Sequence, residues 1–173
     1  NERSLFTFLA SKGSNSISGY EPTQNQTYNL QQVYDYVYYN FYSYLKDANA
    51  DSMTWGAMQL SIEKVEGQEW ESEEQMLQAV NIVKTIGLLN LFGVAGFRLS
   101  KDSLAEYAKQ AMSIPNALGV ISKIEKKKII RYAAYKDRVM LFEGTDVDLE
   151  AEIREAGLMV ARPMAFVDEL NVF

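Results

Sequence analysis

Apolar residues recur every three or four positions in three stretches of the first half of the chain, a period typical of amphipathic helices. The first stretch predicts a helix over residues 30–46, with Asn29 as its N-cap and the side chain of Gln32 reaching back to it. The third predicts a helix that a capping box at 72–75 opens and that runs to about Leu91. The second is marked by four apolar residues, Trp55, Met58, Ile62 and Val65.

The pattern changes near residue 97. A short extended run at 97–99 precedes a helix that Ser100 caps, and a second helix starts near Pro115. Two apolar runs, 128–132 and 138–142, flank a polar turn and predict a β-hairpin. The order helix, short strand, helix, helix, hairpin is that of a winged helix. The sequence therefore predicts a mainly α chain with a small β-hairpin, in which a helical segment is followed by a winged-helix-like domain.

We expect three parts along the chain. Residues 1–70 form a helical, tyrosine-rich, lid-like region with a polar loop at 11–27, and residues 71–145 form the winged-helix-like domain. Residues 146–173 form a C-terminal helix and a tail that leads to a missing downstream region. Because the sequence opens on Asn1 rather than on a methionine, we expect it to be a piece of a larger protein.

The composition excludes several kinds of active site. The 173 residues include no cysteine and no histidine, which removes disulfides, thiol nucleophiles, Ser-His-Asp triads and the usual zinc sites. Neither of the two familiar glycine-rich phosphate motifs occurs. We therefore expect no catalytic residue, metal site or cofactor in this chain. Because no signal peptide and no long uncharged apolar run is present, we expect a cytoplasmic protein without a membrane partner.

Charge is distributed unevenly along the chain. The net charge is -6, yet residues 98–143 hold ten basic and five acidic residues, a local balance of +5. The remainder, with seven basic and 18 acidic residues, stands at -11. We expect the two parts to face different partners.

The basic stretch supplies the candidate contact residues, on the second helix of the helix-turn-helix and on the hairpin. A recognition helix without arginine is expected to form few hydrogen bonds to base edges. Contacts with DNA would therefore be mainly nonspecific contacts with phosphate. A winged helix that contacts protein and leaves its basic face in solvent is the favoured interpretation, and DNA binding is the alternative. The candidate contact residues for nucleic acid or a partner are Asn116, Ser122, Lys123, Lys126, Lys127, Lys128, Arg131, Lys136 and Arg138.

Tyrosines crowd the helix predicted over residues 30–46. They fall on more than one face, so we expect some of them to contact another element, a missing domain or a second copy of the chain. Packing and self-association are favoured over a stacking platform for nucleic-acid bases. The tyrosines are Tyr34, Tyr36, Tyr38, Tyr39, Tyr42 and Tyr44.

Three sequence segments show a family resemblance: NERSLFTFL at 1–9, VKTIGLLNL at 83–91 and LFEGTDVDL at 141–149. They resemble the region C-terminal to the nucleotide-binding core of large bacterial AAA-like, origin-recognition-type P-loop ATPases, often linked to phage defence. In such proteins this region is a helical lid plus a winged helix.

The resemblance implies a non-catalytic regulatory module that couples the nucleotide state of a parent ATPase to a partner. The rest of its own chain would be one partner, and ATP and Mg²⁺ would bind the parent rather than this region. It also implies that Arg3 senses nucleotide, since a guanidinium group stabilises charge on a transferring phosphoryl group. The alternative for Arg3 is an ordinary surface arginine.

Overall fold

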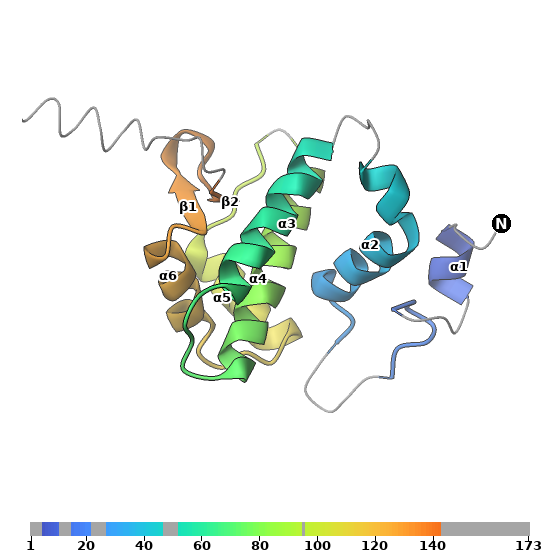
Figure 1. Cartoon of the computed structure of the whole chain (residues 1–173), viewed down its shortest axis with the longest axis horizontal. Helices are drawn as coiled ribbons and strands as arrows, with labels where there is room; N and C mark the ends of the chain where they lie inside the picture. The colour runs from blue at the N-terminus through green and yellow to red at the C-terminus, as the bar shows by residue number, and fades with distance from the viewer. Residues whose placement is uncertain (1–4, 11–14, 22–26, 47–51, 95, 143–173) are drawn as a thin grey trace, which may run out of the picture. The chain divides into compact units, whose positions relative to one another are not determined.

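A computed structural model of the chain describes residues 5–10, 15–21, 27–46, 52–94 and 96–142 (Figure 1). Residues Asn1–Phe142 form one compact unit and Glu143–Phe173 a second. Outside the described residues lie Arg3, most of the polar loop predicted at 11–27, and the predicted C-terminal helix and tail at 146–173.

Helices dominate the first part of the unit, and the three longest lie where the hydrophobic period predicts them. Asn29 caps α2 as expected, because its Oδ1 accepts from the Gln31 N–H at 3.0 Å and its own N–H donates to Gln32 Oε1 at 2.7 Å. Ser72 caps α4, accepting from the backbone N–H of Gln75 at 3.1 Å. The helices are α1 (Leu5–Ala10), α2 (Leu30–Lys46), α3 (Ser52–Glu66) and α4 (Glu73–Phe92).

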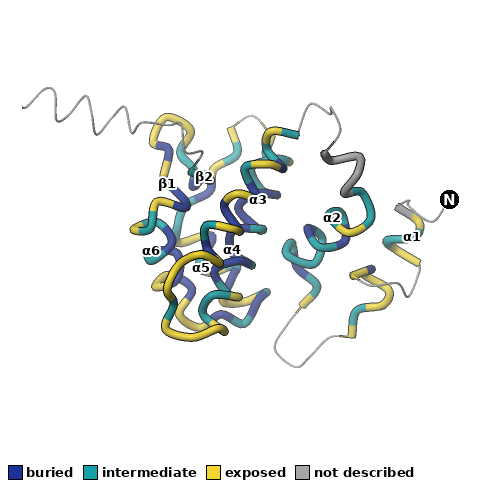
Figure 2. The backbone as a smooth tube through the Cα atoms, in the orientation of Figure 1, coloured by how far each residue is buried: buried dark blue, intermediate teal, exposed yellow. Residues whose placement is uncertain are grey.

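Helix α4 is the centre of the core, and α2, α3, α6 and β2 all pack against it (Figures 1 and 2). Ile82, Val83 and Ile86 on this helix are completely buried. At Gly87 a Cβ atom would lie 2.4 Å from the sulfur of Met58 on α3. Glycine at this position therefore allows α3 and α4 to approach closely.

The second half of the unit follows the predicted order of elements. It contains α5 (Lys101–Ala111), α6 (Ala117–Lys126), β1 (Ile130–Ala133), a 3₁₀ turn (Ala134–Lys136) and β2 (Arg138–Leu141). The strands pair antiparallel, with Ile130 opposite Leu141. Of the extended run expected at 97–99, Leu99 pairs with Arg138 through a single parallel bridge, in which the Val139 N–H donates to the Leu99 carbonyl at 2.9 Å. The expected class, mainly α with a small antiparallel sheet, is confirmed.

The domain division predicted between residues 70 and 71 stays a prediction. The two helices on either side of it, α3 and α4, share one hydrophobic core. Across the described ranges, no helix combines the length and the apolar character that a bilayer crossing requires.

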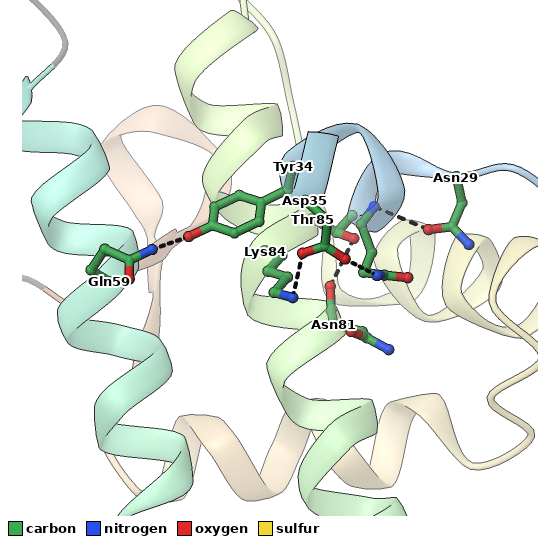
Figure 3. A network of polar contacts seen from close by, with 8 residues as sticks. Asn29, Tyr34, Asp35, Gln59, Asn81, Lys84 and Thr85 are labelled. Carbon is green, nitrogen blue, oxygen red and sulfur yellow. Dashed lines mark hydrogen bonds and ion pairs between the residues drawn. The ribbon is translucent and has the colours of Figure 1, made fainter. Parts of the chain in front are cut away.

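Two of the α2 tyrosines are buried against other elements, as the sequence predicts. Tyr34 is 2% exposed, lies 5.5 Å from the ring of Trp55 and accepts a hydrogen bond from the Gln59 amide of α3 (Figure 3). Tyr36 packs its ring 4.7 Å from that of Phe8 on α1. Tyr39, in contrast, is 74% exposed.

An ion pair joins α2 to α4 beside the buried Tyr34. Lys84 Nζ lies 2.6 Å from Asp35 Oδ1, and the same ammonium group is 5.4 Å from the centroid of the Tyr34 ring (Figure 3). Both side chains are mostly buried, at 17% and 25% exposure. Charge and aromatic packing therefore fix the position of α2 together.

Stability should depend on pH through the buried tyrosines. Burial raises the pKa of Tyr34 above its usual 10.0 and that of Tyr28 to about 12. Because the folded-state pKa values exceed the unfolded ones, their stabilisation is complete below about pH 10 and is lost as pH rises through the folded values. We expect Tyr34→Phe to make this alkaline loss shallower and to cost about 1 kcal/mol at pH 7, through the lost hydrogen bond to Gln59.

Urea denaturation between pH 7 and 11 measures both effects. Tyr39→Phe is the matched control and should change neither, since its side chain is exposed. An alkaline loss of unfolding free energy that is identical in Tyr34→Phe and the unaltered chain would contradict the assignment.

Candidate interaction surface

Helix α6 has one buried and one outward side. Its buried residues follow the helical period and belong to the core, whereas Asn116 at its start and Lys126 at its end are exposed and Ser122 is half-buried. Asn116 and Lys126 are therefore on the outward side of this helix. The buried residues are Ala117, Val120, Ile121 and Ile124.

Two of the candidate lysines turn towards the loop between α3 and α4. Lys123 Nζ lies 3.0 Å from Glu71 Oε1 and donates to Gln75 Oε1 at 2.7 Å. Lys127 Nζ donates to Gln68 Oε1 at 3.2 Å. The hydrogen bond from Lys123 and its charge lower the pKa of Glu71 below its usual value of 4.5.

The indole of Trp70 lies between these contacts. Its centroid is 5.5 Å from the Lys123 ammonium and 5.6 Å from that of Lys127, within range of cation–π attraction. The Trp70 Nε1–H donates to the carbonyl of Val65 at 2.7 Å, which ties the ring to the last turn of α3. We refer to Lys123, Lys127, Gln68, Trp70, Glu71 and Gln75 as the lysine–tryptophan cluster.

The α3–α4 loop is the part of this surface that sequence reasoning missed. Lys123 and Glu71 are 52 positions apart, and local periodicity does not connect positions that distant. The sequence signal that could have indicated this acidic surface is composition, because six glutamates occur within residues 63–74. Each of them is exposed in the structure. They are Glu63, Glu66, Glu69, Glu71, Glu73 and Glu74.

The C-terminal end of α6 presents two further lysines, Lys126 and Lys128, both exposed. Within the described part of the chain, neither ammonium group takes part in an ion pair. The backbone of Lys128 is in the left-handed conformation, with φ 54°. Its N–H donates to the carbonyl of Glu125 at 2.8 Å, and the N–H of Ile129 donates to the carbonyl of Ile124 at 3.0 Å. This pair of bonds is the Schellman motif, in which glycine usually takes the left-handed position.

The hairpin carries the remaining basic candidates. Arg131 stands opposite Met140 and Arg138 opposite Ala133, so the alternation of strand residues places both arginines on one face. Both are half-buried. Lys136 is exposed in the turn, with its ammonium group 5.3 Å from the centroid of the Tyr135 ring.

Carboxylates border the outward side of α6. A hollow of about 250 Å³ between α5 and α6 is lined by two acidic residues, Asp102 and Glu106, and one basic residue, Lys109, together with Leu118. Glu125 lies on α6 itself and pairs with Lys101 at 2.6 Å. Together with the glutamates of the α3–α4 loop, these carboxylates lie beside the basic residues of α6.

The structure therefore brings only some of the predicted contact residues together. Lys126 and Lys128 form an accessible basic end of α6, Lys123 and Lys127 are engaged with the α3–α4 loop, and Lys136 lies on the hairpin turn. Among the described residues, no group of three or more acidic side chains is arranged to hold a metal ion. Comparison with protein-family models, curated proteins and solved structures returned no significant match.

The left-handed Lys128 gives a test of the α6 terminus. An L-residue pays a steric cost in this conformation that glycine avoids, although glycine also loses more entropy on folding. We expect Lys128→Gly to be more stable than Lys128→Ala by about 0.5–1 kcal/mol, measured by urea denaturation. Both variants lose the same charge, so equal stability would show that the left-handed cap is not formed.

Proposed function

We propose that the chain is a non-catalytic interaction module whose basic surface binds an acidic segment of a partner protein. The distribution of charge around α6 carries this proposal. Lys126 and Lys128 are exposed at the end of the helix, while two lysines beside them already bind a carboxylate, two amides and an indole. Carboxylate, amide and indole groups are side-chain groups of proteins, so a partner polypeptide can offer the same kinds of contact to Lys126 and Lys128.

The same surroundings disfavour DNA as the partner. Asp102, Glu106 and one lysine, Lys109, line the hollow next to α6, and the excess of carboxylate there repels the phosphates that a helix in the major groove must approach. Leu118, 49% exposed on the outward side of α6, has no hydrogen-bond donor for a base edge. An apolar residue of this kind is suited to a protein contact.

We propose a winged-helix arrangement for the elements from α4 to β2. Support comes from their order and from the bridge that attaches Leu99 to Arg138 at the edge of the hairpin. In this interpretation α6 is the second helix of the helix-turn-helix and the turn around Lys136 is the wing.

That the module belongs to a P-loop ATPase and couples its nucleotide state to the partner is also a proposal. It rests on the resemblance of residues 1–9, 83–91 and 141–149, and the nucleotide-sensing role of Arg3 belongs to it. The sequence preceding residue 1 in the parent protein tests it. A phosphate loop followed by an acidic Mg²⁺ motif would support the proposal, and their absence there would overturn it.

Binding of fluorescently labelled poly-L-glutamate to the full 173-residue chain, followed by anisotropy, tests the interaction itself. We expect binding that Lys126→Glu combined with Lys128→Glu abolishes, because these ammonium groups are exposed. Lys109→Glu, an exposed site on α5 that is not among the candidate contact residues, is the control and should weaken binding much less than the double variant does. No binding, or equal binding by the double variant, would refute the proposal.

DNA binding remains the second candidate, favoured by the exposed lysines and by Tyr132 and Tyr135 on the hairpin, 41% and 66% exposed. DNA binding predicts that the logarithm of the affinity for a 20-base-pair duplex falls linearly with the logarithm of the salt concentration. The slope is about −0.9 for each phosphate contact. Lys126→Glu combined with Lys128→Glu should then reduce this slope by about two. Absence of duplex binding at low salt would exclude it.

A further inference from the structure

The lysine–tryptophan cluster has the composition of a bound ligand supplied by the chain itself. The α3–α4 loop presents Glu71 and the ring of Trp70 to Lys123, and the first turn of α4 presents Gln75 to the same lysine. Lys123 and Lys126 are three positions apart on α6 and so lie on the same side of it, and a partner segment bound at Lys126 would also reach the ammonium group of Lys123. One lysine cannot give its full charge to both.

We infer that the α3–α4 loop is an internal competitor for the partner: an acidic polypeptide segment binds by displacing Glu71 and Gln75 from Lys123. The inference rests on the proposed function, and it names the residues that control the strength of binding. In the free protein the loop occupies the lysines, and in the complex the carboxylates of the partner replace it.

The exposure of the contacts makes this exchange feasible. The Glu71 side chain is 77% exposed and that of Lys123 28% exposed, so their ion pair is a weak one that solvent screens. An incoming carboxylate replaces it without leaving a buried charge unpaired. The hydrogen bond from Trp70 to Val65 keeps the ring on α3 when the lysines leave it.

The matched variants are Glu71→Gln and Glu69→Gln. Both remove one negative charge from the same exposed loop, but only Glu71 forms an ion pair with a described lysine. We expect Glu71→Gln to bind labelled poly-L-glutamate about two- to fivefold more tightly than the unaltered chain, in proportion to one lost exposed ion pair. Glu69→Gln should change the affinity less than Glu71→Gln, because it relieves general repulsion alone.

Each outcome has one meaning. Equal affinity of the two variants, or weaker binding by Glu71→Gln, overturns the internal competitor while leaving the proposed function intact. Failure of the unaltered chain and both variants to bind poly-L-glutamate overturns the proposed function and the inference with it. Binding to the DNA duplex without binding to poly-L-glutamate would also overturn both, and it would favour the DNA alternative.

Tryptophan fluorescence supplies a readout that a purely structural role of the loop would not move. When the lysines leave the ring, Trp70 loses two neighbouring ammonium groups, whereas Trp55 stays buried at 6% exposure. We expect saturating poly-L-glutamate to change the emission spectrum of the unaltered chain. Binding with an unchanged spectrum would show that the cluster stays closed in the complex, contrary to the inference.

Discussion

The close approach of α3 and α4 at Gly87 is the constraint on which the rest of the structure depends. With no Cβ at this position, Met58 packs directly on the α4 backbone, and the two helices align along their length. This alignment brings the loop between them, with Trp70 and Glu71, up to the side chains of α6. A larger residue at position 87 would meet the side chain of Met58, which would have to shift within a completely buried part of the core.

Local signals predicted the elements of the fold because the forces that start and end helices act within a few residues. The caps at Asn29, Ser72 and Ser100 lie where the sequence places them, and each makes the expected hydrogen bond to the helix that it begins. The hairpin was predicted for a similar reason, since its two strands are separated by one short turn. How these elements pack depends on contacts between distant positions, such as that of Gly87 with Met58, and no local pattern encodes them.

The candidate site was predicted less completely because charge along a sequence differs from charge on a surface. Counting residues gives the stretch 98–143 a balance of +5, but Lys123 is paired with Glu71, which lies outside that stretch. Arg98 and Asp137 pair within it, at 3.3 Å. The basic residues that remain accessible at the end of α6 are therefore fewer than the sequence suggests, and they are bordered by carboxylates.

These surroundings change which property of the surface decides its partner. On an isolated basic helix, affinity would follow the number of lysines and would favour the most highly charged polymer, nucleic acid. Here the glutamates of the α3–α4 loop and the two acids of α5 repel any dense array of phosphates, whatever its sequence. An acidic polypeptide carries at most one charge per residue, fewer for its length than duplex DNA, so it meets less of that repulsion and still reaches Lys126 and Lys128. On the proposed function, selectivity for protein over nucleic acid would follow from placing acidic residues beside the lysines, and it would not require the lysines themselves to differ from those of a DNA-binding helix.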